Sequence, residues 1–567
     1  MKNLRWELLI AAGGLALVVG LLLGQTPAPA TDVSQPVQGG AYSEALVGEL
    51  VRLNPVLDFD HPTDRDIDRL LYSGLVRFDS RGIPSPDLAE DWAVSADARL
   101  YTFTLREDAR WHDGEPVTAD DVIYTFSLFQ DEAYPGPADL QQFWEQVSIV
   151  RLDTRAVQFE LPEPFAPFLD YVSVGLLPDH LLRGVTVSAL VDHPFHLEPV
   201  GAGPFAFSSF LTEGDDIRGV SLEAFEEYAG ERPFLERVEF RLYATPADAL
   251  EAYESGLVQG IGSVDESILP DVLAHPGLNL YTSRVPRIGV IFLNLAHPDR
   301  TFLAEKRVRQ ALLMALNMEW ILSQTLPGQA VVASGPILPG TWADPEGLAP
   351  LPFDLGRASD DLDSLEWLIP VGAGPGTPEF VRTHEDQTMT LQLAFPDESP
   401  WREVAALVQE NWAALGVQTE LVPASPEAIL ADYLEPREFE AVLTEIDLSR
   451  FPDPDPYPFW HDSQIESGQN YSGFNDRNTS IWLEQARTTP DLGKRAELYR
   501  SFLHRFQDQV PALLLYYPVY NYAVDSAVQG ISLGPLWDPS DRFITVNLWH
   551  LLARRGAPAP AEPSPEP

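Results

Sequence analysis

Helix-like and strand-like patterns of apolar residues alternate along most of the chain. An apolar stretch at Leu391–Phe395 predicts a strand, and apolar residues at helical spacing follow from Val404 to Leu415. Gly416 directly after this pattern is typical of a helix C-terminus. The alternation over 417–421 then predicts a second strand.

The pattern continues into a third strand. Ser425 and Pro426 form an N-cap and first-turn proline for a short helix that ends near Leu434, and Phe439–Thr444 predicts the next strand. The whole stretch is therefore a β-α-β-α-β unit. The other well-marked elements are helices at Val308–Leu316 and Leu498–Phe506 and a strand at Ala512–Tyr517.

The first third of the chain has a different pattern. Tyr101–Leu105 alternates as a strand, and Thr118–Asp121 resembles a capping box before a helix over Val122–Phe129. In Gly201-Ala-Gly203-Pro204 we expect a structural turn with close backbone approach, leading into a strand through Phe205 and Phe207. Glycine and proline accumulate at 260–276, which indicates a boundary, so the chain is predicted to be mixed α/β in at least two lobes.

Composition restricts the class of protein further. The 567 residues correspond to about three to four ordinary domains or one very large unit. Apolar residues make up 45% and charged residues 22%, which is typical of a folded globular protein. The absence of cysteine excludes disulfides, thiol nucleophiles, cysteine-bound metal and a lipid-modified N-terminal cysteine.

The net charge argues against a nucleic-acid partner. Asp and Glu number 85 against 37 Lys and Arg, for a formal net charge of −48. Such a field repels phosphate backbones, and its general effect is to keep the protein soluble. It identifies no ligand.

The N-terminus has the pattern of an export segment. Lys2 and Arg5 precede an apolar run from Leu8 to Gly24, and small residues and prolines follow up to Ala30. We expect residues 1–30 to be an uncleaved membrane anchor with its basic end inside, and cleavage after Ala30 is the alternative. Residues 31–41 form a linker, and the tail at 553–567, rich in Pro, Ala and Glu, is expected to be disordered.

Motifs for catalysis and metal binding are weak. Most histidines are scattered, and the one close pair, His193 and His196, lies beside Pro194 without helical patterning. No Gly-x-Ser-x-Gly motif is present, and the glycine-rich segment at 201–204 lacks the remaining residues of a phosphate loop. We expect no catalytic residue, no metal and no cofactor.

A proline-rich aromatic loop is the strongest candidate for ligand binding. It runs from Asp447 to His461 and reads DLSRFPDPDPYPFWH. Its prolines pre-order the backbone, so that carboxylates, a guanidinium and aromatic faces stand at fixed positions, which suits a polar ligand. A rigid surface loop without a ligand is the alternative.

Several segments together resemble the extracytoplasmic solute-binding proteins of the peptide/nickel (oligopeptide-binding, family 5) class of ABC importers. The similarity covers about residues 46 to 551. The segments that carry it are Arg65–Trp92, Tyr101–Phe126, Pro199–Phe207, Arg307–Asn317, Asp453–Pro456, Asn470–Asn475, Lys494–Tyr499 and Pro511–Tyr517.

The resemblance implies a two-lobed periplasmic-binding-protein-like α/β fold, with an extra inserted subdomain and a ligand cleft between the lobes. Lobe I would comprise residues 42–80, 197–269 and 509–552. The inserted subdomain would occupy 81–196 and lobe II 270–508. By analogy with the family, the lobes would close on a ligand, and the closed form would dock on the permease.

The resemblance also implies ligand-binding residues. Peptide binders of the family commonly hold the ligand's α-ammonium with an Asp three residues before the Asp-Pro step, and Arg450 stands at that place here. Arg450 therefore suits an anionic group, and Asp447 could replace the missing Asp if the loop is rearranged. The expected ligand contacts are Asp447, Arg450, Phe451, Asp453, Trp460 and Asn294, with Tyr42 and Glu44 as weaker candidates.

The resulting hypothesis is a monomeric, non-enzymatic importer component outside the cytoplasm, tethered by its N-terminal helix. It would bind a peptide or similar polar oligomer and deliver it to an ABC permease and its ATPase. The alternatives are an oligosaccharide ligand, a sensor that serves no importer, and a secreted hydrolase that uses paired carboxylates.

Overall fold

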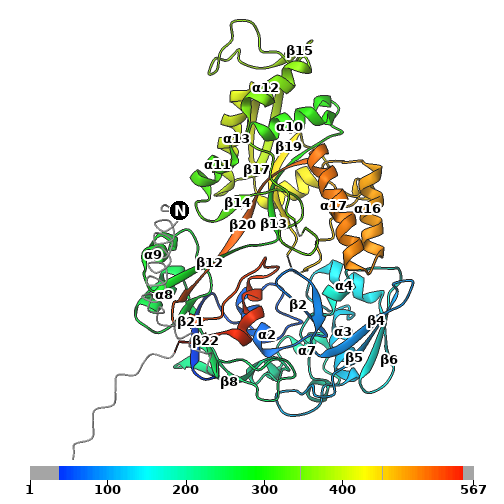
Figure 1. Ribbon diagram of the computed structural model, residues 1–567, viewed down its shortest axis with the longest axis vertical. Helices are drawn as coiled ribbons and strands as arrows, with labels where there is room; N and C mark the ends of the chain where they lie inside the picture. The colour runs from blue at the N-terminus through cyan, green and yellow to red at the C-terminus, as the bar shows by residue number, and fades with distance from the viewer. Residues whose placement is uncertain (1–37, 345, 450, 553–567) are drawn as a thin grey trace, which may run out of the picture.

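The computed structural model describes residues 38–344, 346–449 and 451–552, which form two lobes (Figure 1). The lower lobe in this view contains both ends of the described chain, and the upper lobe contains its middle. Among the described residues, no helix is long and apolar enough to cross a membrane. The predicted anchor at 1–30 and the predicted tail at 553–567 lie outside the described residues.

One twelve-stranded sheet runs through both lobes. Strand β20 (Ala512–Asp525) is its central member, because it pairs with strands of both lobes. The upper-lobe strands are β13 (Arg287–Leu293), β14 (Ala330–Val332), β17 (Thr390–Pro396), β18 (Gln418–Ala424) and β19 (Ala441–Asp447). The lower-lobe strands are β1 (Ala41–Val47), β8 (Phe205–Glu213), β9 (Asp216–Ala224), β10 (Arg237–Tyr243), β11 (Gly260–Ile261) and β12 (Leu278–Arg284).

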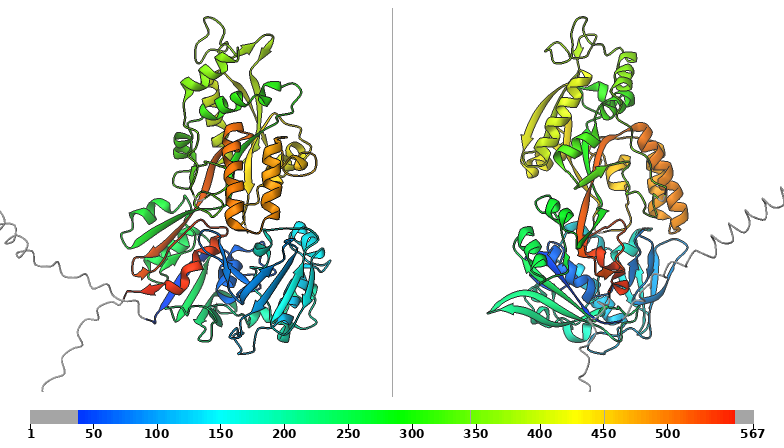
Figure 2. Two further views of the ribbon diagram at one scale, coloured as in Figure 1. Left: turned by 45° about the vertical axis from the view of Figure 1, so that its right-hand side comes forward. Right: turned by 60° about the vertical axis from the view of Figure 1, so that its left-hand side comes forward.

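Two chain crossings join the lobes. The first half of β20 pairs antiparallel with β13, and its second half pairs antiparallel with β12 from Val519 to Asp525. Only Val285 and Pro286 separate β12 from β13, so the chain passes from the lower to the upper lobe there. It passes back along β20, which pairs with both strands. Figure 2 shows β20, in orange, running from one lobe into the other in both views.

The upper-lobe sheet is buried on both faces. Along β13, Ile291 and Leu293 belong to one apolar core, and Val290 and Phe292 belong to another on the opposite face. This alternation follows from the two-residue period of a strand. The covering helices are α10 (Lys306–Met314), α11 (Met318–Thr325), α12 (Leu355–Ser364), α13 (Trp401–Leu415), α14 (Pro426–Ala428), α15 (Tyr457–Trp460), α16 (Arg477–Thr488) and α17 (Leu492–Gln509).

The lower lobe includes a second, four-stranded sheet in the order β4-β5-β7-β6. Its core is continuous with that of the lower-lobe part of the large sheet, through residues such as Phe103, Trp144 and Phe205. The strands are β4 (Ala89–Val94), β5 (Leu100–Leu105), β6 (Ser148–Arg151) and β7 (Ala156–Glu160). The helices are α2 (Pro62–Leu71), α3 (Ala119–Phe129), α4 (Ala138–Glu145), α5 (Phe168–Tyr171), α6 (Asp179–Leu182), α7 (Val187–Leu190), α8 (Pro246–Glu254) and α9 (Leu269–Ala274).

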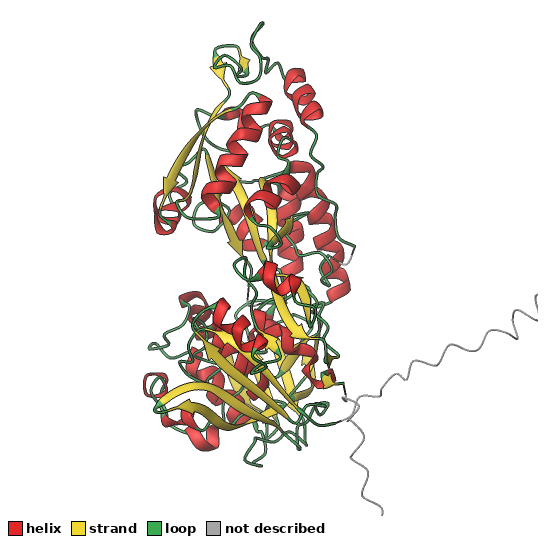
Figure 3. Cartoon of the chain, turned by 90° about the vertical axis from the view of Figure 1, so that its left-hand side faces the viewer, coloured by secondary structure: helices red, strands yellow, loops and turns green. Residues whose placement is uncertain are grey.

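Small elements complete the two lobes. The 3-10 helix η5 (Pro539–Leu548) follows β20 and packs against α2. The remaining elements are η1 (Pro194–Leu197), η2 (Thr301–Ala304), η3 (Ile429–Leu434), η4 (Asp462–Gln464), β2 (Val76–Phe78), β3 (Pro84–Pro86), β15 (Thr383–His384), β16 (Gln387–Thr388), β21 (Val528–Gln529) and β22 (His550–Leu551). Figure 3 shows the two lobes edge-on, with strands passing between them.

Most elements predicted from local patterns are present. The β-α-β-α-β unit is β17, α13, β18, α14 with η3, and β19, and Gly416 ends α13 with φ 87° as expected of a left-handed cap. Thr118 and Asp121 form the predicted capping box of α3. One predicted strand length is wrong. The strand predicted to end at Tyr517 continues to Asp525, because Pro518 is accommodated in the strand opposite Ala330 of β14.

The turn at Gly201 and Gly203 is structural, as predicted. The backbone N–H of Gly203 donates to the carbonyl of Leu71, and a Cβ at Gly201 would lie 1.9 Å from that oxygen. His112 accepts a hydrogen bond at Nδ1 from the Gly201 N–H. The turn therefore fixes the start of β8 against the end of α2.

Candidate functional site

A cavity of about 310 Å³ lies in the lower lobe, where α2 and η5 meet the helices that pack beside the four-stranded sheet. The loop at 55–59 and the segment at 72–78 form one wall, and Leu140 and Trp144 of α4 contribute another. Phe451 and Pro452 reach it from the upper lobe. The cavity is thus enclosed by segments that are far apart in the sequence.

One face of α2 supplies the polar centre of the cavity. Arg65, Asp68, Arg69 and Tyr72 all line it. Arg65, Asp68 and Arg69 lie on one face of the helix, at spacings of three and four residues, and Tyr72 follows directly as its C-cap. The opposite face of the helix, with Ile67 and Leu71, is buried in the apolar core.

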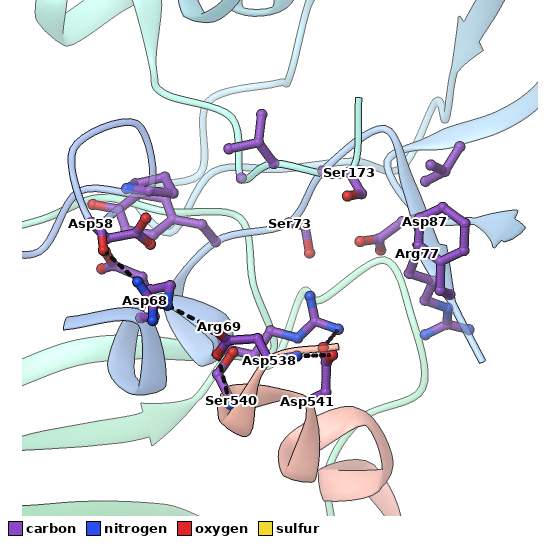
Figure 4. Close-up of a pocket in the computed structure, with 18 of the residues that line it drawn as sticks. Asp58, Asp68, Arg69, Ser73, Arg77, Asp87, Ser173, Asp538, Ser540 and Asp541 are labelled. Carbon is purple, nitrogen blue, oxygen red and sulfur yellow. Dashed lines mark hydrogen bonds and ion pairs between the residues drawn. The ribbon is translucent and has the colours of Figure 1, made fainter. Parts of the chain in front are cut away.

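Two ion pairs join this face to η5. Arg65 Nε lies 2.9 Å from Asp538 Oδ2, and Arg69 Nη2 lies 2.9 Å from Asp541 Oδ1. Asp538 and Asp541 are also the two members of the η5 capping box, so the helix start is held by the same carboxylates. Figure 4 shows Arg69, Asp538 and Asp541 close together in the lower part of the view.

Asp58 and Asp68 lie next to each other at one end of the cavity (Figure 4). Asp68 Oδ2 accepts the backbone N–H of Asn54 at 2.9 Å. Burial, and then the neighbouring carboxylates of Asp58 and Asp64, raise the pKa of Asp68 well above its ordinary value. Burial and the same two cavity carboxylates, Asp68 and Asp58, raise the pKa of Tyr72.

The other end of the cavity contains Arg77 and Asp87, and Ser73 lies between the two ends (Figure 4). Burial raises the pKa of Asp87, although the charges of Arg77 and Arg69 oppose this shift. Carboxylates outnumber guanidinium groups on the cavity wall. The lining carboxylates are Asp58, Asp68, Asp87, Asp170, Glu231, Asp538 and Asp541, and the lining guanidinium groups are Arg65, Arg69 and Arg77.

Aromatic rings connect the upper lobe to this cavity. Phe451 stacks on Tyr171 with ring centroids 4.6 Å apart and planes 17° apart. Both rings line the cavity, together with Phe129, Tyr134 and Trp144. The site therefore combines a charged floor with apolar and aromatic walls, which suits a ligand with both polar groups and hydrocarbon.

Buried polar contacts hold the Phe451 loop against the lower lobe. The backbone N–H of Asp453 donates to Asp170 Oδ2 at 2.7 Å, and the Asp453 side chain forms an ion pair with Arg495 of α17. Burial and the Asp453 charge raise the pKa of Asp170 well above its ordinary value, while Arg495 opposes the shift. Near this contact, the Ala166 N–H donates to the Arg487 carbonyl.

Of the eight residues predicted from the sequence to bind ligand, only Phe451 lines the cavity among those that the structure describes. Arg450 lies outside the described residues. Asp453 is corrected to a structural residue, because it is 8% exposed and its carboxylate is paired with Arg495. Through these contacts Asp453 nevertheless anchors the loop that contains Phe451.

Trp460 and Asn294 are also corrected, because both are buried, whereas Asp447 stays a prediction. Trp460 is 2% exposed and packs in the upper-lobe core against Phe506, with ring centroids 4.7 Å apart. The Asn294 amide is buried and donates to the carbonyls of Arg437 and Phe439. Asp447 is exposed at the end of β19, where it accepts the Ser449 N–H, and it does not line the cavity.

Tyr42 and Glu44 are corrected as well, since both are fully buried in the lower lobe. The Tyr42 hydroxyl donates to Glu44 Oε2 at 2.6 Å, and Arg542 Nη2 donates to Glu44 Oε1 at 2.6 Å. Arg542 also pairs with Asp66 of α2. This buried charge network positions η5 under the cavity and leaves neither residue free to contact a ligand.

Sequence analysis missed the polar face of α2 and its partners in η5. A signal was present, because Arg65, Asp68 and Arg69 lie at helical spacing opposite the apolar residues Ile67 and Leu71. The partners Asp538 and Asp541 come more than 460 residues later, and no local pattern links them to α2. The cavity lining contains no histidine among the described residues, and those residues contain no group of three metal-binding side chains.

Comparisons with known proteins identify relatives over most of the chain. The model of the family described as bacterial extracellular solute-binding proteins, family 5 Middle, matches residues 84–468. The oligopeptide-binding protein AppA of Bacillus subtilis is 25% identical over 512 residues, covering 89% of this chain and 91% of AppA. The dipeptide-binding protein of Escherichia coli is 25% identical over 537 residues, covering 89% and 95%.

Solved structures share the fold and differ in how well they superpose. AppA from Bacillus subtilis in complex with a nonapeptide has a TM-score of 0.60, at 25% identity, and covers 91% of this chain and 100% of its own. MppA, a periplasmic murein tripeptide-binding protein in an unliganded open form, has a TM-score of 0.74 at 19% identity, covering 91% and 99%.

Proposed function

Because the chain belongs to the bacterial extracellular solute-binding proteins of family 5, we propose that it captures a peptide for an ABC importer and delivers it to the permease and its ATPase. The family match, which extends over residues 84–468, is the observation that carries this proposal. A member of this family is a solute-binding protein and not an enzyme, and it acts outside the cytoplasm. The hydrolase alternative is therefore set aside.

We favour a peptide over an oligosaccharide because the relatives described above are named for oligopeptides, dipeptides or a tripeptide. The cavity supports this choice chemically. Peptides carry charged termini and mixed side chains, and the site offers guanidinium groups, carboxylates and aromatic faces in one cavity.

The proposed contacts are Phe451 and Tyr171 on the aromatic side and the polar face of α2 on the other. Arg450, which precedes Phe451, is proposed to hold an anionic group such as a ligand carboxylate by a bidentate pair. Binding would draw the upper lobe toward the lower lobe about the two chain crossings.

The test is a ligand screen on the purified protein, with peptides and oligosaccharides of matched size. A ligand at 100 times its dissociation constant should stabilise the folded protein by about 2.7 kcal/mol and raise the melting temperature. We expect peptides to raise it and sugars not to. Stabilisation by sugars alone, or by neither class, would overturn peptide binding.

Phe451→Ala is the matching variant, because it removes the ring that stacks on Tyr171. Loss of an aromatic contact of about 0.5 to 1.5 kcal/mol should weaken peptide binding about two- to tenfold by calorimetry. Phe353→Ala is the control, since Phe353 is 49% exposed and does not line the cavity. Equal affinities of the two variants would remove Phe451 from the site.

We also propose that residues 1–30 tether the protein to the outer face of the membrane and that it acts as a monomer. The basic start and the apolar run at Leu8–Gly24 support the tether. Tethering would keep the binder near its permease at high effective concentration. Mass spectrometry of the membrane fraction tests this, because cleavage after Ala30 would give a soluble chain that begins at Thr31.

The proposed domain limits are those implied by the resemblance, with an inserted subdomain at 81–196 and lobe II at 270–508. The four-stranded sheet at 89–160 supports the first range. For lobe II the strand pairing favours a later start, near residue 285, because β12 pairs with the lower-lobe half of β20. Limited proteolysis at the crossings would test these limits.

A further inference from the structure

We propose that Asp68, with Asp58 beside it, forms a subsite of the cavity for a cationic nitrogen group of the ligand, either an ammonium or a guanidinium. The inference rests on the proposed function, since it names a chemical group of the solute.

The strongest observation is an unpartnered carboxylate oxygen in the cavity wall. Asp68 is 3% exposed, and its Oδ2 is bonded to the Asn54 N–H. Its Oδ1 is buried and has no hydrogen-bond partner among the described residues. A buried carboxylate oxygen without a donor is costly, and a ligand N–H group entering the cavity would supply the missing donor.

The arginines on either side of Asp68 are directed elsewhere. Arg65 donates to Asp538 and to the carbonyls of Asp58 and Phe59. Arg69 pairs with Asp541. Both cations that α2 contributes to the cavity are therefore held by groups other than the Asp68 carboxylate.

Several carboxyl groups lie close together at this end of the cavity. The Asp58 and Asp64 carboxylates both act on Asp68 and disfavour its ionised form. A cation between Asp58 and Asp68 would offset this repulsion, because opposite charges stabilise the ionised form of a carboxylate.

The surrounding walls suit the hydrocarbon part of a basic group. Val56, Leu140 and Trp144 line the same cavity. Lysine and arginine side chains bury their methylene stems on apolar surface while their charged ends reach a polar partner. The same walls would accept the first residue of a peptide whose α-ammonium meets Asp68.

A proton or a water molecule on Asp68 is the competing explanation. The buried Nδ2 of Asn54 also has no hydrogen-bond partner among the described residues, so a single water between the two groups would satisfy both. Such a water would give the protein no preference for cationic ligands. The two explanations therefore differ in a measurable property.

The test uses the full purified chain and two equimolar pools of random pentapeptides, one with free and one with acetylated N-termini. Bound peptides are recovered by native mass spectrometry after denaturing extraction and then sequenced. We expect the wild type to favour cationic peptides by about tenfold to a hundredfold, as for a hydrogen bond to a charged group. Loss of this preference on acetylation would assign the cation to the α-ammonium, and enrichment of Lys and Arg in both pools would assign it to a side chain.

Asp68→Asn keeps the oxygen that accepts the Asn54 N–H and removes the charge, and it should abolish the preference. Asp60→Asn is the control, because Asp60 is exposed, close in sequence and not part of the cavity lining. Asp58→Asn is the second variant, which keeps the test valid if Asp68→Asn does not fold, and it should reduce the preference.

The outcomes separate the two levels of inference. If neither pool binds to the wild type, peptide binding itself is overturned. If peptides bind without a preference for cations, or if Asp68→Asn and Asp58→Asn keep the preference, the cationic subsite is overturned while peptide binding stands.

Discussion

Arg542→Met should strongly destabilise the lower lobe. Arg542 is fully buried and donates to Glu44 through Nε and Nη2, at 3.0 and 2.6 Å, and to Asp66 through Nη1. The substitution leaves two carboxylates in the core without their cation. Removing one partner of a buried ion pair costs about 3 to 5 kcal/mol, and we expect a loss of this size in the free energy of unfolding at pH 7.5.

The loss should depend on pH in a defined direction. Burial raises the pKa of Asp66 to about 6 even with Arg542 present, and without Arg542 it should rise further. A carboxyl whose pKa is higher in the folded state gains stability as the pH falls through that pKa towards its unfolded value. The variant should therefore recover part of its loss between pH 7.5 and pH 5, relative to the wild type at each pH.

Urea unfolding monitored by tryptophan fluorescence is the assay, because Trp549 packs on Tyr42 beside this network with ring centroids 5.5 Å apart. The triple variant Glu44→Gln, Asp66→Asn, Arg542→Met is the control, since it removes all three charges and should regain most of the stability. A loss below about 1 kcal/mol for Arg542→Met, or an equal loss at both pH values, would refute the assignment of a stabilising buried network.

Two further substitutions test the packing and the contact between the lobes. Gly201→Ala should cost about 3 kcal/mol or more in the free energy of unfolding, because its Cβ would lie 1.9 Å from the Leu71 carbonyl oxygen. Gly374→Ala is the control and should be tolerated, because the space around Gly374 is open. Equal melting temperatures of the two variants would contradict this account. Asp170→Asn keeps an acceptor for the Asp453 N–H and removes a buried charge whose pKa is raised, so it should raise the melting temperature at pH 7.5. That gain should shrink as the pH falls, because protonation of Asp170 in the folded state removes the same buried charge from the wild type, and a gain that does not change with pH would count against it.

Features with a local physical cause could be predicted from the sequence. The left-handed cap at Gly416, the capping box at Thr118 and the close-packed turn at Gly201 each depend on a few neighbouring residues, and all three are present. The family could be recognised for the same reason, because its motifs are short segments in a fixed order.

The site residues could not be predicted in the same way, because burial is decided by tertiary packing. Trp460 and Phe451 occur in the same proline-rich loop, yet one ring packs in the upper-lobe core and the other lines the cavity. Tyr42 and Glu44 are polar residues near the start of the fold, and nothing nearby in the sequence indicates that Arg542 covers them. Only the face of α2 gave a signal that could have been used.

The shared strand β20 has a consequence for the order in which the chain can fold. β1 reaches β20 only through the two residues of β11, and the Tyr42 hydroxyl bonds to the Tyr522 hydroxyl across 480 positions of sequence. β1 can pair with β10 and β11 earlier, but its link to β20 waits for nearly the last strand. Contacts this distant form slowly, so the growing chain stays incomplete until its C-terminal segment is available. For a protein that must cross a membrane before it folds, late completion of the lower lobe keeps the chain competent for export.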